Sequence, residues 1–193
     1  MNYEIIIASA ITAIATLLSV MVRQKYTARK PICPVTKDAI QGANVYTSLQ
    51  KTLEEMGGDR AYVLEFHNGG SYYSGRGQQK FSCTHEVVLQ GISRECNNSQ
   101  EHRVSNYYEY INHMIKKGEF KYINAQEVRD VSFLQLINRS GIESIYNIPI
   151  KTVNGKIIGI LGVDYVKKPS KDFHEKHRHI MVNKAKVIAG YLI

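Results

Sequence analysis

The chain has 193 residues, 44% hydrophobic and 22% charged, which is enough for one globular domain of ordinary size and an appendage. Its formal net charge of +8 does not indicate nucleic-acid binding, because five of the 25 basic residues lie beside an apolar segment and no zinc finger, RNP sequence or basic recognition helix is present. Its three cysteines lack framework spacing and fit a reducing compartment better than a disulfide-stapled fold.

An uncharged stretch near the amino terminus, residues 5–22, predicts a membrane-spanning helix. At about 1.5 Å per residue it reaches about 27 Å, enough for a thin bilayer core. A cleaved signal peptide is the alternative, but it would carry positive charge before the apolar run, where the only charged side chain is Glu4. Basic residues crowd the other flank, at Arg23, Lys25, Arg29 and Lys30. This bias predicts a single-pass anchor, residues 1–26, in the inner (cytoplasmic) membrane with a cytoplasmic carboxy-terminal domain.

Small hydroxyl residues follow one stripe of the apolar segment. They are Ser9, Thr12, Thr16 and Ser19, at spacings of three, four and three. Small residues let helices approach closely, so the stripe favours self-association into a homodimer or a higher homo-oligomer. The alternative is that each hydroxyl bonds back to its own helix backbone.

Residues 27–41 are predicted to form a juxtamembrane linker, in which residues 27–34 should not be helical because they contain Pro31 and Pro34. A second apolar stripe predicts an amphipathic helix that stops at Gly57 and Gly58. Its members are Tyr46, Leu49, Leu53 and Met56. This helix either joins two subunits or packs on its own sheet, and the pattern leaves both arrangements open.

The middle of the chain predicts two strands, at 61–67 and 80–89, separated by a glycine-rich loop at 68–79. Residues 104–115 keep helical spacing until Gly118 ends the helix. A short strand at 120–124 and a short helix at 130–139 follow, with Ser132 and Gln135 as a capping pair.

The most informative stretch is ESIYNIPIKTVNGKIIGILGVDYV, residues 143–166. It consists of two apolar strands joined at Asn154 and Gly155, a pair that tolerates the positive φ angles of a tight hairpin. Residues 157–163 are almost continuously apolar and predict a central strand covered on both faces. A long amphipathic helix then closes the chain.

The NG turn, the "IIGILGVDY" strand and the closing helix resemble the carboxy-terminal half of a GAF domain. This resemblance implies an α+β fold, a GAF-like antiparallel sheet with flanking helices, over residues 42–193. The "LEFHNGGSYYSG" and "SCTHEVV" segments also resemble small bacteriophage-encoded GAF-like proteins with an "FHNGG" loop. GAF and PAS domains bind small ligands in many sensors and only hold dimers together in others, so the resemblance leaves the function to residues elsewhere.

The ligand site is predicted at the glycine-rich loop and the strand after it. Glycines let backbone amides converge, tyrosine rings offer stacking and an arginine fork suits phosphate or carboxylate, which favours an anionic or nucleotide-like small molecule. The alternative is a surface loop with a structural turn. On the second strand, period-two alternation puts Cys83 and His85 on one face and Glu86 on the other. The predicted site residues are His67, Asn68, Gly69, Gly70, Tyr72, Tyr73, Arg76, Cys83, His85 and Glu86.

No cofactor, metal or catalytic set is indicated. Walker spacing and the phosphodiesterase GAF residue set are missing, and His67, Cys83 and His85 lack zinc-site spacing. Cys83 and Cys96 invite comparison with a GAF-fold methionine sulfoxide reductase, but the flanking sequences do not match. The chain is therefore predicted not to be an enzyme.

Two functions of different classes remain from the sequence. The first is a membrane-anchored, dimeric GAF-like module that senses or binds a small molecule. The second is a holin-like protein that regulates lysis, because large holins of T-even phages also combine one amino-terminal span with a soluble domain. The holin places that domain in the periplasm, whereas the basic flank here predicts the cytoplasm.

Overall fold

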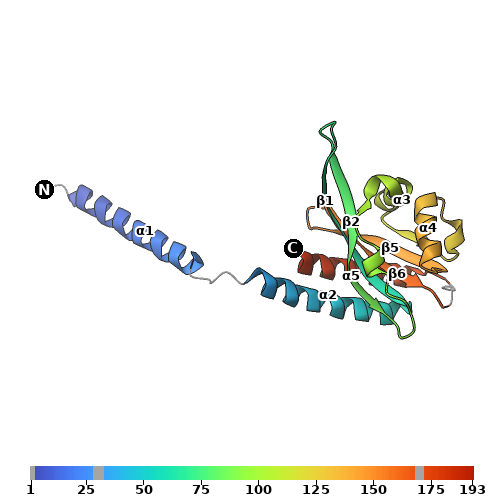
Figure 1. Ribbon diagram of the computed structural model, residues 1–193. Helices are drawn as coiled ribbons and strands as arrows, with labels where there is room; N and C mark the ends of the chain where they lie inside the picture. The colour runs from blue at the N-terminus through green and yellow to red at the C-terminus, as the bar shows by residue number, and fades with distance from the viewer. Residues whose placement is uncertain (1–2, 28–32, 168–171) are drawn as a thin grey trace. The chain divides into compact units, whose positions relative to one another are not determined.

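The computed structural model describes residues 3–27, 33–167 and 172–193, and it divides into two compact units, Met1–Asp38 and Ala39–Ile193. In the first unit, α1 (Tyr3–Thr27) is one continuous helix (Figure 1). Its stretch Ile6–Lys25 is apolar and long enough to cross a membrane, and none of it is buried. The predicted basic residues Arg29 and Lys30 lie outside the described residues.

The hydroxyl stripe of α1 bonds to the helix that carries it. Thr12 and Thr16 each donate to the carbonyl oxygen four residues earlier, both at 2.8 Å, and Ser9 and Ser19 donate three residues back at 2.9 and 2.8 Å. These bonds satisfy the hydroxyls without a partner helix. This is the predicted alternative in which each hydroxyl bonds back to its own helix backbone. The stripe therefore needs no neighbour for its polar groups.

The second unit is built on a six-stranded antiparallel sheet in the order β3-β2-β1-β6-β5-β4. The strands are β1 (Arg60–Ser71), β2 (Gly77–Val88), β3 (His102–Arg103), β4 (Phe120–Tyr122), β5 (Ser144–Lys151) and β6 (Ile157–Tyr165). The apolar strand β6 lies between β1 and β5 with helices over both faces, which explains its nearly continuous hydrophobic sequence. The predicted α+β fold with an antiparallel sheet is confirmed.

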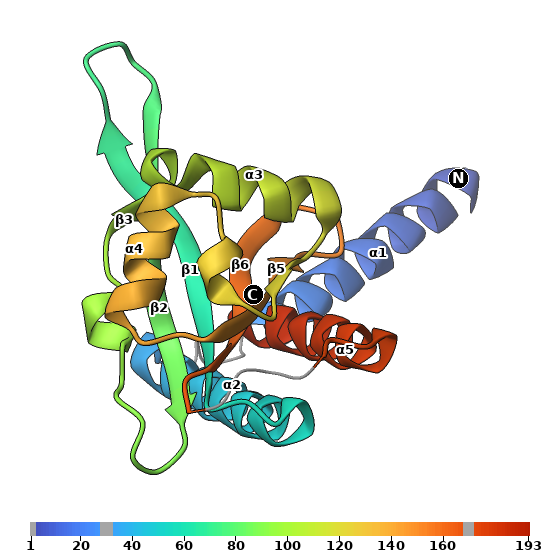
Figure 2. The same ribbon diagram turned by 90° about the vertical axis from the view of Figure 1, so that its right-hand side faces the viewer.

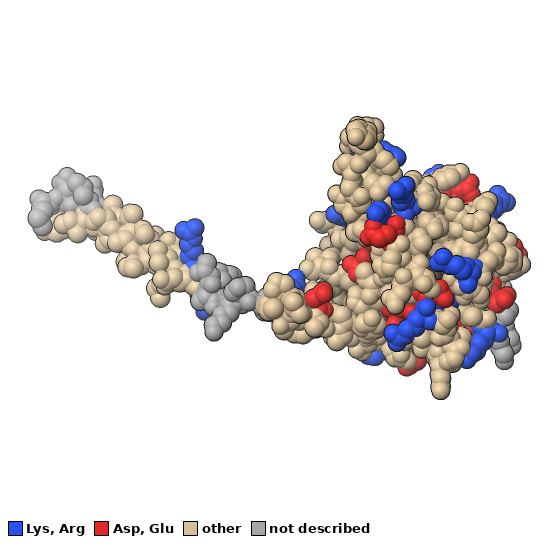
Figure 3. Space-filling model, in the orientation of Figure 1, with Lys and Arg blue, Asp and Glu red and all other residues tan. Residues whose placement is uncertain are grey.

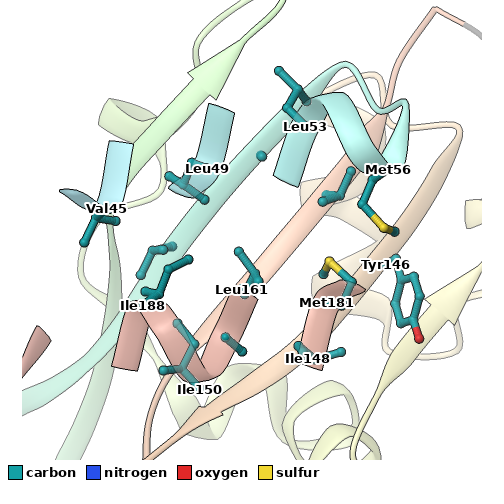
Figure 4. Packing of buried hydrophobic residues seen from close by; sticks show 14 of the residues in the cluster. Val45, Leu49, Leu53, Met56, Tyr146, Ile148, Ile150, Leu161, Met181 and Ile188 are labelled. Carbon is teal, nitrogen blue, oxygen red and sulfur yellow. The ribbon is translucent and has the colours of Figure 1, made fainter. Parts of the chain in front are cut away.

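One face of the sheet is covered by α2 (Pro34–Met56) and α5 (Glu175–Leu192) (Figures 1 and 2). Figure 4 shows α2 side chains directed at the sheet beside Met181 and Ile188 of α5. Leu49, Leu53 and Met56 of the predicted α2 stripe are buried there and pack on their own sheet, whereas Tyr46, the fourth member, is 44% exposed.

The opposite face is covered by α3 (Tyr108–Lys117) and α4 (Val131–Arg139) (Figure 2). Aromatic rings join these helices, since Tyr110 stacks on Phe133 with centroids 3.8 Å apart and Phe120 meets both rings edge-on. The helix α3 ends as predicted at Gly118, whose φ of 75° gives the left-handed cap that glycine favours.

Three local predictions were wrong. Pro34 begins α2, because proline fits the first turn of a helix, so this last residue of the stretch predicted not to be helical is in fact helical. The cap of α4 is Asp130, which accepts from the Phe133 amide at 3.0 Å, rather than a Ser132–Gln135 pair.

The third concerns the β5–β6 turn. It is longer than two residues, because Thr152 pairs with Lys156 and only Gly155 has a positive φ. This is the three-residue type of hairpin loop with a left-handed glycine.

Candidate functional site

A buried ion pair lies where β1 and β6 are paired. Arg60 begins β1 and stands opposite Asp164 of β6, with side chains 1% and 4% exposed and Nε 3.3 Å from Oδ2. The Arg60 guanidinium also donates to the carbonyl oxygens of Ser140 at 3.2 Å and Ser93 at 3.4 Å. It therefore ties the sheet to the end of α4 and to the segment after β2.

A chain of buried hydrogen bonds continues from Asp164 across the sheet. The Tyr62 hydroxyl lies 3.1 Å from Asp164 Oδ1 and 3.0 Å from Asn147 Oδ1, and the Asn147 amide donates to the Tyr110 hydroxyl at 2.8 Å. A hydroxyl has a single proton, so Tyr62 donates to one oxygen only. A proton on Asp164 lets both contacts be hydrogen bonds, with Asp164 donating to Tyr62 and Tyr62 donating to Asn147.

The pKa of Asp164 agrees with that arrangement. Burial raises it to about 7, against the lowering effects of Arg60 and of the Tyr62 hydrogen bond, and the carboxylates of Glu86 and Glu95 raise it further. Burial likewise raises the pKa of Tyr62 and of Tyr110, so both phenols stay neutral. Asp164 thus changes charge near neutral pH inside the domain.

A cavity of about 40 Å³ lies beside this network, between the sheet and α4. It has room for water or one small polar group, far less than the roughly 300–1,000 Å³ of a typical small-molecule pocket. Its lining is Arg60, Tyr62, Leu64, Phe81, Cys83, Glu86, Glu95, Ser99, Phe133, Leu136, Ile137, Ser140, Ile142, Ile145 and Asp164.

A second carboxylate at this cavity is only half satisfied. Glu86 is 3% exposed, and its Oε1 accepts from the Glu95 amide at 2.9 Å. Its Oε2 is buried without a hydrogen-bond partner among the residues described. A buried carboxylate oxygen without a donor costs about 1–3 kcal/mol or more, which makes Glu86 a candidate position for binding a hydrogen-bond donor in the cavity.

A wider hollow of about 290 Å³ lies next to the cavity at strand β2. Glu86 and Cys83 line both spaces. The other residues of the hollow are Tyr46, Thr84, Arg94, Cys96, Asn97 and Gln100. Burial raises the pKa of Cys83 and of Cys96, which keeps both thiols protonated and poorly nucleophilic.

Of the ten predicted site residues, Cys83 and Glu86 line the cavity. His85 does not, because a β-bulge at Thr84 shifts the register, so that Leu64 pairs with Cys83 and Val63 with His85. His85 instead packs edge-on against Tyr46 of α2, with ring centroids 5.2 Å apart. The predicted alternation was therefore wrong after Cys83: Glu86, not His85, shares its face.

The predicted glycine-rich loop is mostly strand. Residues 68–71 and 77–79 extend β1 and β2 into a hairpin that projects beyond the sheet (Figure 2). His67 contacts Ser82 Oγ at 2.9 Å, Gly69 packs over Lys80, and the Asn68 side chain accepts from the Gly70 amide at 3.0 Å.

At the tip of the hairpin, Arg76 stacks over Tyr72 at 4.8 Å and Tyr73 is fully exposed. Tyr72 and Arg76 line an open hollow of about 170 Å³ with Val104 and Ser105. This hollow lacks a buried polar group, so the tip resembles an exposed turn more than a ligand pocket.

Sequence reasoning missed the network residues Arg60, Tyr62, Asn147 and Asp164. The signal was present, because Asp164 interrupts the apolar β6 sequence and Arg60 immediately precedes the apolar β1 sequence. Charged residues at such positions are buried only when paired.

The fold defined by this sheet and its helices is that of GAF domains. The structure matches the Thermosynechococcus elongatus PixJ GAF domain in its blue-light absorbing form, with a TM-score of 0.62 and 12% identity over 80% of this chain and 88% of that one. It also matches the GAF domain region of a putative membrane protein from Geobacter sulfurreducens, with a TM-score of 0.57 and 14% identity over 82% of this chain and 98% of that one.

A far-red absorbing protein with bound biliverdin matches with a TM-score of 0.58 and 10% identity, over 77% of this chain and 86% of that one. Identities this low show the fold alone. No protein-family model matches the chain, and a sequence search of curated proteins finds no match. The narrower resemblance to phage proteins with an "FHNGG" loop stays a prediction.

Proposed function

We propose that the chain is a membrane-anchored sensing or binding module whose GAF-fold domain takes a small molecule between the sheet and α4. The observation that carries this is the half-satisfied Glu86 carboxylate, which lies beside the buried Arg60–Asp164 pair and lines both the cavity and the adjoining hollow. Stability alone does not call for an unpartnered buried carboxylate, whereas a binding site does.

The ligand differs in size from the biliverdin of the similar structure, because a cavity of about 40 Å³ has no room for a tetrapyrrole. The absence of catalysis remains a prediction from the sequence; the raised pKa values of Cys83 and Cys96 argue only against thiolate chemistry at these two residues. Basic and acidic residues are interspersed over the face in Figure 3, which gives no basic stripe of the kind that binds nucleic acid.

Membrane attachment is proposed through α1, whose apolar surface is exposed along its length. We propose a cytoplasmic location for the GAF-fold domain, because basic residues follow α1 and the positive-inside rule favours that orientation. Homodimer formation through α1 and an origin in a bacteriophage remain predictions from the sequence.

Ligand binding is tested on the full chain in detergent by thermal unfolding with a panel of small metabolites. We expect at least one compound to raise the midpoint, since a ligand at 100 times its Kd stabilises by about 2.7 kcal/mol. Ser99→Phe fills the cavity and should abolish the shift, whereas Ser105→Phe, at the hairpin hollow, should leave it intact. If Ser105→Phe abolishes the shift and Ser99→Phe does not, the ligand binds at the hairpin hollow instead. If no compound in the panel raises the midpoint, the proposal is contradicted.

Orientation is tested by fusing a reporter to the carboxy terminus. We expect activity from a cytoplasmic reporter and none from periplasmic phosphatase, because of the basic residues that follow α1. Phosphatase activity would instead support the holin-like alternative, whose soluble domain lies in the periplasm.

A further inference from the structure

The cavity beside Glu86 carries an excess of negative charge. Three carboxylates line it, those of Glu86, Glu95 and Asp164, and among the described residues of its lining the only cationic side chain is that of Arg60. The net charge of these four side chains is −2 when all three carboxylates are ionised and −1 when Asp164 is protonated. An anion entering this space meets repulsion, and a cation meets attraction that water screens little.

The guanidinium of Arg60 is already committed elsewhere. It lies 3.3 Å from Asp164 and 3.9 Å from Glu95, and it donates to two backbone carbonyl oxygens. No described Lys, Arg or His forms an ion pair with Glu86. The Glu86 Oε2 atom therefore offers a buried acceptor with neither a donor nor a counter-charge.

A metal ion does not suit this acceptor. Among residues 3–27, 33–167 and 172–193 no three His, Cys, Asp or Glu side chains are grouped so as to hold one. The remaining cations that both donate hydrogen bonds and carry charge are ammonium and the protonated amine, amidinium and guanidinium groups of organic molecules. The adjoining hollow of about 290 Å³ favours those that carry an organic group.

We infer that the ligand of this site is a small organic cation whose N–H group is received by Glu86 Oε2. The inference rests on the proposed function and names its ligand class. The charged head occupies the inner cavity of about 40 Å³, and the rest of the molecule lies in the adjoining hollow of about 290 Å³, with Glu86 at the wall that both share. Arg94 lines the outer hollow and disfavours a second positive charge there, so the ligand is a monocation.

The experiment is calorimetric titration of the full chain in detergent with matched probes. Propylammonium, 2-hydroxyethylammonium and acetamidinium are compared with the neutral propanol and acetamide and with the anion propionate. We expect at least one cation to bind more tightly than its neutral counterpart and propionate not to bind. Glu86→Gln keeps the shape and removes the charge, and it should weaken the cation about tenfold or more. Glu109→Gln, an exposed acid on α3, is the matched control and should change nothing.

The outcomes separate the two proposals. If neutral or anionic probes bind and cations do not, the ligand class is wrong while ligand binding stands. Equal binding of cations by wild type and Glu86→Gln also overturns the inference. A cooperative unfolding transition and an unchanged circular dichroism spectrum show that the variant is folded in this comparison. If neither these probes nor the metabolite panel bind, both proposals fail.

Discussion

Replacing Arg60 with methionine is expected to lower the free energy of unfolding by about 3–5 kcal/mol, the usual cost of removing one partner of a buried ion pair. The change strands Asp164 and removes the donors to the carbonyl oxygens of Ser93 and Ser140. Denaturant titration of the full chain in detergent, followed by tyrosine fluorescence, measures it, because the chain has 13 tyrosines and no tryptophan. Arg76→Met, at the exposed hairpin tip, is the control and should cost under about 0.5 kcal/mol.

The cost of Arg60→Met should grow as the pH rises. Asp164 has a folded pKa of about 7, above its ordinary value of 3.8, so its protonation favours the folded state at low pH and that contribution is lost as the pH rises through 7. Arg60 lowers this pKa, so without it the carboxylate becomes still harder to ionise. The difference between variant and wild type should be larger at pH 8 than at pH 5. A cost below about 1 kcal/mol at both pH values contradicts the role given to the pair.

Substituting Gly162 by alanine is expected to destabilise the domain by about 3 kcal/mol. Gly162 lies in β6, and a Cβ there would overlap the Tyr62 ring and approach Asn147 Oδ1 to 2.5 Å. Both neighbours are fixed by the buried hydrogen-bond chain, so relief of the overlap breaks at least one bond. Overpacking costs about 1–3 kcal/mol and a lost buried hydrogen bond about 1–3 kcal/mol more.

The matched control for this glycine is Gly190→Ala in α5. A Cβ at Gly190 meets nothing within 4 Å, so helix propensity alone predicts a gain of about 0.5–1 kcal/mol. Chemical denaturation of both variants checks the pair. A neutral Gly162→Ala would mean that the ring of Tyr62 moves freely, which is incompatible with its hydrogen bonds to Asn147 and Asp164.

The fold was largely predictable because its strongest signals are local. Gly155 takes the positive φ that the NG pair predicted, Gly118 caps its helix, and the apolar residues 157–163 form a strand covered on both faces. The errors are also local. Asp130 competes with Ser132 as a cap, and both have the chemistry for it, so the choice depends on backbone geometry that a pattern does not contain.

The candidate site was less predictable because it depends on strand register. Arg60 and Asp164 are adjacent only because β1 and β6 pair antiparallel at that step, and they are far apart in the sequence. The bulge at Thr84 has no marker such as glycine, yet it decides that Glu86 rather than His85 faces the cavity side. Glycine-rich sequence in the hairpin suggested a loop, but cross-strand pairing such as that of Asn68 with Gln79 made it strand.

The measurement that tests the central claim most directly is methyl NMR of the full chain in detergent, titrated with the compound that binds most tightly in the screens. Ile137, Ile142 and Ile145 line the cavity, whereas Ile148 and Ile150 lie in the core on the other face of the sheet. Binding between the sheet and α4 predicts shifts of the first three methyl groups, with Ile148 and Ile150 unchanged. Shifts confined to Ile148 and Ile150, or no change at saturating ligand, would contradict it.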